Sequence, residues 1–137
     1  MSKISTVISE PVAKILKKGT FAFLGTVMKD GSPHVTPTWV DIENGTILVN
    51  TAIGRTKQKN ISRDGRVALA IADQSNPYDM VTVRGKVVQQ ITGPVAEEHI
   101  DKLAKKYMGK DKYPGRGPGE KRILLKIKPE KVSHMKQ

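Results

Sequence analysis

A basic segment in the middle of the chain combines residue types that bind anions. It covers residues 54–66, GRTKQKNISRDGR, and sets five cationic side chains against one carboxylate. Its length suits a helix, but Ile61 is its only large apolar residue, so it has no apolar stripe to bury. A helix N-terminus presents unpaired N–H groups and a positive dipole, to which Arg55 and Lys57 would add full charges. A solvated basic face would explain the charges alone, whereas the position directly after Asn50-Thr51 favours an anionic ligand.

The other residues that could do chemistry form weaker patterns. His34, His99 and His134 are far apart and lack ligand spacing, so we expect strand or surface histidines rather than a metal site. The run GRGPG at 115–119 lacks the preceding strand and the Lys-Ser/Thr pair of a phosphate loop, and it indicates a flexible loop. Cysteine is absent, which excludes disulfides, thiolate metal centres and cysteine nucleophiles. No nucleophile–base pair stands out, so an enzyme with this sequence would take its chemistry from a cofactor.

The composition is that of a small, basic globular protein. The chain has 137 residues, and 24 Lys and Arg against 13 Asp and Glu give a net charge of +11. This length suits a single domain over residues 1–137. The charge favours an anionic partner, but an aromatic content of 4% argues against nucleic acid bound through base stacking. Neither a membrane span nor a signal peptide is present, so we expect a soluble, cytoplasmic protein.

The elements that must position these residues begin with a helix and three strands. Residues 9–19 predict a helix with an apolar stripe of Val12, Ile15 and Leu16. From residue 20 the apolar period changes to two, with both faces apolar, as in a barrel or a covered sheet. Turns at Asp30-Gly31 and Asn44-Gly45 then separate strands over 20–28, 34–42 and 46–51. Three antiparallel strands should therefore form a meander.

The middle strand of this predicted meander contains the run Val35-Thr36-Pro37-Thr38-Trp39. Pro37 cannot donate a ladder hydrogen bond, so it requires an edge strand or a bulge. Thr36 and Thr38 share the face opposite Pro37, where two hydroxyls could bind a ligand. Trp39 alternates with Pro37 and Val35, which favours a tryptophan in the core.

The second half of the chain predicts three strands and one helix. The strands cover 66–72, 80–88 and 122–128, with a short extension from Val132. Residues 94–109 predict a helix whose apolar stripe consists of Ala96, Ile100, Leu103 and Tyr107. The whole pattern predicts about six antiparallel strands with small helices outside, most simply a barrel.

Three stretches taken together resemble a known family. They are FAFLGTVMKDGSPHVTPTWVD, ILVNTAIGRTKQKNISRDGRVALAIAD and NPYDMVTVRGKV. They resemble the split β-barrel flavin and deazaflavin oxidoreductases related to pyridoxamine 5'-phosphate oxidase, in particular their F420-dependent branch. The resemblance covers residues 10–130. It implies a mainly β fold, a six-stranded antiparallel split barrel, which forms a homodimer with two cofactor sites at the subunit interface.

The resemblance also implies which residues bind the cofactor. Those along the flavin or deazaflavin ring would be Val35, Thr36, Pro37, Thr38 and Trp39. Those around its phosphate would be Asn50, Thr51, Ala52, Arg55, Lys57 and Asn60. A third group near the ring or the partner subunit would be Asn76, Pro77 and Tyr78. Tyr78 is in addition a candidate proton donor.

Two cofactors fit this resemblance, since F420 and FMN both have a phosphate that Arg55 and Lys57 could hold. F420 adds a lactyl–oligoglutamate tail, and the net charge of +11 suits this longer anion. Lys59, Arg63 and the lysines of residues 105–121 are candidate tail contacts. We therefore favour an F420-dependent oxidoreductase that transfers hydride to or from a small unsaturated substrate.

Other functions stay open at this stage. An FMN-binding flavoprotein and a non-catalytic F420 or FMN carrier are the alternatives within the family. The C-terminal sequence KPEKVSHMKQ lacks the substrate-binding arginine segment and the ending of the vitamin B6 oxidases, which argues against oxidation of pyridoxamine phosphate.

Overall fold

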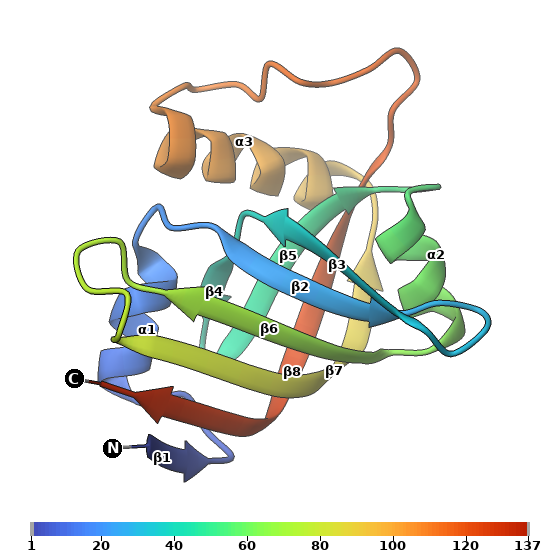
Figure 1. Ribbon diagram of the computed structural model, residues 1–137. Helices are drawn as coiled ribbons and strands as arrows, with labels where there is room; N and C mark the ends of the chain where they lie inside the picture. The colour runs from blue at the N-terminus through green and yellow to red at the C-terminus, as the bar shows by residue number, and fades with distance from the viewer. Residues whose placement is uncertain (1, 137) are drawn as a thin grey trace.

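The chain folds into one antiparallel sheet that curls on itself and has helices on its outside (Figure 1). The computed structural model describes residues 2–136. Its strands are β1 (Ser2–Ser5), β2 (Ala22–Val27), β3 (Pro33–Thr38), β4 (Asp41–Glu43), β5 (Thr46–Ala52), β6 (Arg66–Ala72), β7 (Met80–Ile91) and β8 (Arg122–Met135). Its helices are α1 (Glu10–Lys17), α2 (Thr56–Arg63) and α3 (Pro94–Met108). The hydrogen-bonded strand order is β3-β2-β6-β7-β8-β5-β4, and β1 pairs with β8 beside this path.

This strand order makes the sheet close towards a barrel. β3 and β4 lie at the two ends of the order, yet only Trp39 and Val40 separate them in the chain. A connection of this length reaches about 11 Å at most, so the two edges must lie near each other. The predicted fold class, a mainly β split barrel, is confirmed.

The inside of the curled sheet is apolar. Residues of β2, β5, β6, β7 and β8 point into this core, and α1 adds the predicted stripe of Val12, Ile15 and Leu16. α2 adds Ile61. The strand residues buried in this core include Leu24, Val49, Leu69, Val83, Leu125 and Ile127. The barrel interior is therefore filled by side chains, and a ligand has to bind outside it.

α3 lies across one end of the curled sheet, at the top of Figure 1, where it packs against β5 and β8. It starts after Gly93 and ends at Gly109, whose φ of 71° is the left-handed conformation that glycine adopts most easily. The side of α3 that faces the sheet is buried and includes Ala96, Ile100 and Leu103. These bounds and this stripe confirm the predicted helix over 94–109.

The predicted strand over 34–42 is wrong in one respect, because it breaks into β3 and β4 at Trp39 and Val40. α3 causes the break. The Val40 N–H donates to the hydroxyl of Tyr107 at 2.9 Å, and the Lys106 ammonium donates to the Val40 carbonyl at 2.7 Å. Both hairpins of the predicted three-strand meander form, β2 with β3 and β4 with β5, but the break in the middle strand places the two pairs at opposite ends of the strand order. Pro37 does lie on an edge strand, as predicted.

Other strand limits also differ from the prediction. The two short strands β1 and β4 raise the number from six to eight among the described residues, and β7 runs on to Ile91. β8 is continuous over the predicted strand and its extension. Its Pro129 lies opposite Gly85, where the register of β7 shifts. A bulge is one of the few places where a sheet accepts proline, which explains why the strand does not end there.

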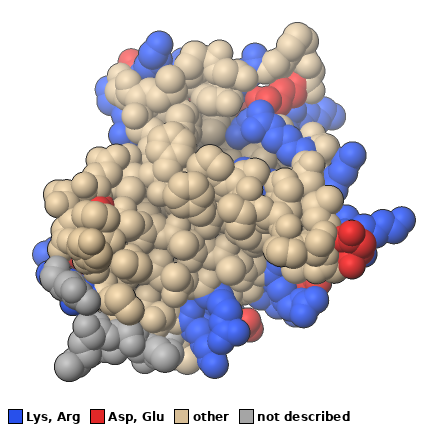
Figure 2. All heavy atoms as spheres, viewed as in Figure 1, with Lys and Arg blue, Asp and Glu red and all other residues tan. Residues whose placement is uncertain are grey.

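The outer face of β2 and β3 is apolar and open. Phe21 and Phe23 are about half exposed, Val35 is 62% exposed, and Phe23 lies opposite Pro37 across the strand pair. Figure 2 shows this side of the molecule as a broad uncharged area with Lys and Arg at its margins. The sequence of β2 is apolar on both faces, which predicts a sheet covered on both sides. Within one chain, however, the outer face of β2 is uncovered.

Candidate functional site

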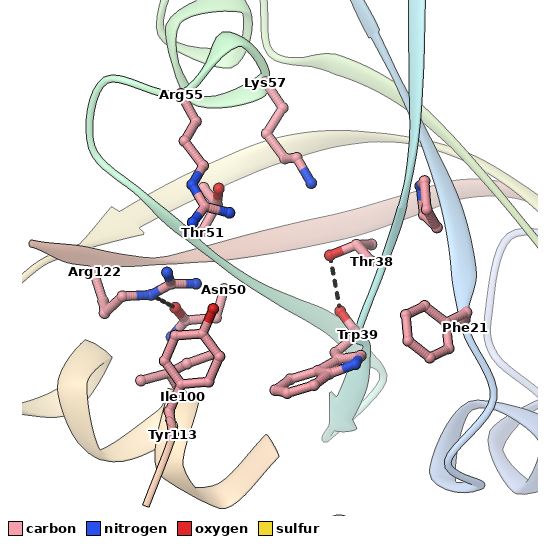
Figure 3. Close-up of a pocket in the computed structure, with 11 residues that line it drawn as sticks. Phe21, Thr38, Trp39, Asn50, Thr51, Arg55, Lys57, Ile100, Tyr113 and Arg122 are labelled. Carbon is pink, nitrogen blue, oxygen red and sulfur yellow. Dashed lines mark hydrogen bonds between the residues drawn. The ribbon is translucent and has the colours of Figure 1, made fainter. Parts of the chain in front are cut away.

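A polar hollow lies where the ends of β3 and β5 meet the starts of α2 and β8 (Figure 3). We call it the basic pocket, and its volume is about 150 Å³. α3 and the segment before β8 close one side of it. Its lining consists of Phe21, Pro37, Thr38, Trp39, Asn50, Thr51, Arg55, Lys57, Ile100, Tyr113 and Arg122.

Three cations face this pocket. Arg55 lies just before α2, Lys57 lies in its first turn, and Arg122 is the first residue of β8. Among the residues that the structure describes, Glu120 is the only carboxylate paired with them, at 3.3 Å from Arg55 and 3.1 Å from Arg122. Burial, together with the charges of Arg55 and Arg122, lowers the pKa of Lys57. The pocket therefore has an excess of positive charge that a bound anion would offset.

Asn50 fixes the position of Arg122. The Arg122 Nε–H donates to Asn50 Oδ1 at 2.9 Å, and the Asn50 amide donates to the Ala96 carbonyl at 2.9 Å. The guanidinium also lies over the ring of Tyr113, 5.1 Å from its centroid. Asn50 is thus a pocket residue whose hydrogen bonds lie within the protein, and its role is to hold Arg122 in place.

The hydroxyl of Thr51 is the clearest sign of a ligand. It is buried in the pocket lining and has no hydrogen-bond partner among the described residues. A buried hydroxyl without a partner costs about 1–3 kcal/mol. Beside Lys57 and two arginines, it can donate to an oxygen of a bound anion. This donor set fits a phosphate group.

Aromatic rings form one wall of the pocket. Trp39 stacks on Tyr107 with ring centroids 5.2 Å apart, and it meets the edge of Tyr113 at 5.8 Å. Phe21 contacts Tyr107 edge-on at 5.7 Å. The prediction of a core tryptophan is wrong, since Trp39 is only half-buried and lies at the break between β3 and β4, outside the apolar core.

A second hollow adjoins the basic pocket along β3. This adjacent pocket has a volume of about 500 Å³ and shares Pro37, Arg55 and Lys57 with it. Thr36 and His34 line it from β3, and the Thr36 hydroxyl and His34 Nδ1 are both buried without a partner in the described part of the chain. The two pockets together form a continuous, polar and basic surface between β3 and the start of α2.

Several residues expected at the site lie elsewhere. Ala52 is buried and lines neither pocket. Asn60 faces the protein interior, where its amide donates to the Thr26 hydroxyl at 2.9 Å. Val35 points to the open outer face of β3. The loop with Asn76, Pro77 and Tyr78 joins β6 to β7 and contributes to neither pocket of its own chain. Tyr78 is therefore not placed as a proton donor within one chain.

The pocket lining also includes four residues that no sequence pattern marks as ligand contacts, namely Arg122, Tyr113, Ile100 and Phe21. Arg122 had one signal, since it is a cation directly before the apolar run Ile123-Leu124-Leu125 and so begins a buried strand. Tyr113 and Ile100 become pocket residues only through the packing of α3, which the sequence does not specify.

The described residues contain no group of three or more His, Asp or Glu side chains that could hold a metal ion. No helix within residues 2–136 is both long and apolar enough to cross a membrane.

The curled sheet and its basic pocket define a split-barrel protein. The family model of pyridoxamine 5'-phosphate oxidase matches residues 8–136, and the chain belongs to this family. No curated protein matches the chain.

Solved structures support the same assignment. An F420 reductase is 26% identical, with 87% of this chain and 93% of that chain covered and a TM-score of 0.75. A conserved hypothetical protein from Mycobacterium tuberculosis is 21% identical over 96% and 88% of the two chains, with a TM-score of 0.73. General Stress Protein 26 from Bacillus anthracis is 18% identical over 92% of each chain, with a TM-score of 0.68. The last two show the fold alone.

Proposed function

We propose that this chain is an F420-dependent oxidoreductase whose basic pocket holds the phosphate of the deazaflavin cofactor. One observation carries the proposal: Arg55, Lys57 and Arg122 line the same pocket as Thr51, whose buried hydroxyl has no partner among the described residues. Arginine can bind two phosphate oxygens in parallel, lysine acts as a point charge, and a threonine hydroxyl donates to a further oxygen.

Two observations favour F420 over FMN. The structural neighbour with 26% identity is an F420 reductase, and the net charge of +11 exceeds what one phosphate requires. Lys59 is exposed on α2, near the pocket, and is a candidate contact for the carboxylates of the F420 tail. FMN would use the same phosphate contacts, so it is the alternative cofactor that the experiment below tests.

When bound, the deazaflavin would supply hydride transfer to or from an electron-poor carbon of a small unsaturated substrate. The protein would bind the cofactor and orient it towards the substrate. Pro37 and Thr36 line the adjacent pocket and would lie beside the ring, while the Trp39 wall would shield it from water. No side chain in the two pockets is assigned as a catalytic acid.

We further propose that a second copy of this chain completes the site. The basic pocket of about 150 Å³ has room for a phosphate, so the ring would extend beyond it along the adjacent pocket, which Pro37 of the open apolar face also lines. Pro37 and Phe21 line this pocket and also border the open apolar face that includes Phe23. An uncharged face on a chain of net charge +11 fits an identical uncharged face, and the dimer would cover the site from outside.

The proposal is tested by titrating cofactor-free protein with F420 and FMN in parallel. We expect tight binding of F420, weaker binding of FMN, and loss of both in the Arg55→Ala/Lys57→Ala variant. The double variant Lys14→Ala/Lys17→Ala is a charge-matched control, because these exposed lysines lie on α1 and line no part of the pocket.

Each other outcome has a definite meaning. A preference for FMN would place the chain with the flavin-binding proteins of the family. Tight F420 binding without turnover of quinones, enones or tetrapyrroles would indicate a carrier. If neither cofactor binds, the proposal is wrong, and the basic helix is a solvated face or a nucleic-acid patch.

A further inference from the structure

The amide of Asn50 has a single satisfactory orientation. Its Nδ2 lies 2.9 Å from the Ala96 carbonyl, which can only accept, and its Oδ1 lies 2.9 Å from the Arg122 Nε–H, which can only donate. Rotating the amide by half a turn would place donor against donor and acceptor against acceptor. The residue is 6% exposed, so water cannot replace the lost hydrogen bonds.

This orientation determines the proton position on His99. The imidazole Nδ1 lies 3.2 Å from Asn50 Nδ2, which donates, so Nδ1 must accept and the proton of the neutral ring is on Nε2. That Nε2 is buried and has no hydrogen-bond partner among residues 2–136. His99 is 8% exposed and comes from the buried face of α3.

Charged groups of three elements surround this imidazole. From β4, the Asp41 carboxylate lies 3.8 Å from Nε2, and Lys102 of α3 lies 3.8 Å from the same carboxylate. Lys106 acts on Asp41 through its charge. A further hollow beside His99 is lined by Glu43, Glu98 and Lys126, among others. Positive and negative charges are thus both present around the ring. The hydrogen bond from Asn50 is directional, and it requires that Nδ1 of His99 carry no proton.

We propose that His99, through Asn50, positions Arg122 for the anion, and that protonation of His99 weakens anion binding. A second proton would go to Nδ1 and turn an acceptor into a donor facing the Asn50 amide. Asn50 then has to move, and any movement breaks its hydrogen bond to Arg122 or to Ala96. Without the Asn50 contact, the guanidinium of Arg122 keeps only Glu120 and the Tyr113 ring as partners among the described residues. His99 would be a positioning residue that acts on the basic pocket from outside it.

The inference rests on the proposed function, because it assumes that the basic pocket binds an anion. It is tested with sulfate, whose charge does not change between neutral and mildly acidic pH. In the wild type we expect the sulfate dissociation constant to rise more than about tenfold between neutral pH and about pH 5.5, the effect of losing one hydrogen bond to a charged group. His99→Gln offers an acceptor but does not titrate, so its affinity should stay nearly constant over this range. His134→Gln is the control, since His134 of β8 contacts Asp79, the residue before β7, and it should keep the wild-type dependence.

A second measurement distinguishes failure of the His99 inference from failure of the proposed function. It uses the wild type, so it does not depend on whether His99→Gln folds. In ¹⁵N NMR spectra of the ligand-free wild type, the Arg122 Nε–H resonance should move together with the ring resonances of His99 as the pH falls. An Arg122 resonance that ignores the His99 titration, or an equal loss of sulfate affinity in His99→Gln, would overturn the inference. If instead sulfate, F420 and FMN all fail to bind while Arg122 still follows His99, the coupling is supported and the proposed function is wrong.

Discussion

The indole of Trp39 stacks on the phenol of Tyr107, with the two planes only 13° from parallel. The Tyr107 hydroxyl accepts from the Val40 N–H at 2.9 Å and donates to the Thr20 carbonyl at 2.8 Å. One side chain of α3 therefore fixes both the break between β3 and β4 and the aromatic wall of the basic pocket. The shape of the site depends on this contact between helix and sheet, and not on its strands alone.

Tyr107→Phe should destabilise the fold while keeping the stacked ring. The substitution leaves the Val40 N–H and the Thr20 carbonyl without a partner, at a cost of about 1–3 kcal/mol in the free energy of unfolding. Urea denaturation followed by Trp39 fluorescence measures this change. Tyr78→Phe is the control, because Tyr78 is 62% exposed and its loss of a hydroxyl should have no effect. Equal stability of the two variants would contradict the role assigned to Tyr107.

The same residue predicts a pH dependence at high pH. Burial raises the pKa of Tyr107 from 10.0 to about 12. Because the folded state holds this proton more tightly than the unfolded state, the stabilisation is complete below about pH 10 and is lost as the pH rises towards about 12. We expect the stability difference between wild type and Tyr107→Phe to shrink across this window. A difference that stays constant from pH 9 to 12, measured by urea denaturation, would show that the Tyr107 hydroxyl ionises normally.

Anion binding should weaken at high pH because of Lys57. Its pKa is lowered by burial and by Arg55 and Arg122, and a bound anion favours the charged form. Binding therefore requires proton uptake once the pH exceeds the lowered pKa, so sulfate affinity falls as the pH rises. Lys57→Arg keeps its charge and should remove this dependence. Lys14→Arg, on α1, should retain it, and an unchanged pH profile in Lys57→Arg would assign the effect to another group.

The open apolar face should hold two copies of the chain together. Phe23→Asp places a charge at its centre, opposite Pro37, and should give a monomer in analytical ultracentrifugation. Cofactor affinity should fall with it if the partner covers the site. Val88→Asp makes the same kind of change at an exposed residue of β7, and it should leave the oligomeric state unaltered. A wild-type chain that sediments as a monomer would refute the dimer directly.

Gly85→Ala should destabilise the fold, although it adds only one methyl group. A Cβ at Gly85 would collide with the carbonyl oxygen of Lys128 on the paired strand, and backbone cannot move aside as a side chain does. We expect a loss of about 1–3 kcal/mol in the free energy of unfolding, measured by thermal or urea denaturation. At Gly117 a Cβ would meet nothing within 4 Å, so Gly117→Ala is the matched control.

The features that could be predicted from the sequence are those encoded locally. The helix over 94–109 has its stop glycine and apolar stripe in the sequence itself, and the basic segment containing Arg55 and Lys57 is recognisable by composition. The split barrel followed from the alternating strands and from the family resemblance. Such signals need no knowledge of distant contacts.

The features that escaped prediction depend on partners far along the chain. β3 ends where it does because Tyr107, 67 residues later, holds Val40. Arg122 joins the pocket through Asn50, which is 72 residues away. Asn60 looked like a ligand residue, but its amide is held by Thr26, 34 residues earlier. A polar residue is free for a ligand only where the fold leaves it without a partner, and one sequence does not specify such pairs.

β8 pairs with β1, β5 and β7, and no other strand within residues 2–136 connects β5 to β7. It is also the last of these strands to leave the ribosome. Until it does, the nascent chain has two separate pieces of sheet, with β7 and β5 each lacking a neighbour. Closure of the barrel must therefore follow the emergence of β8, and until then the chain exposes unpaired strand edges that favour aggregation.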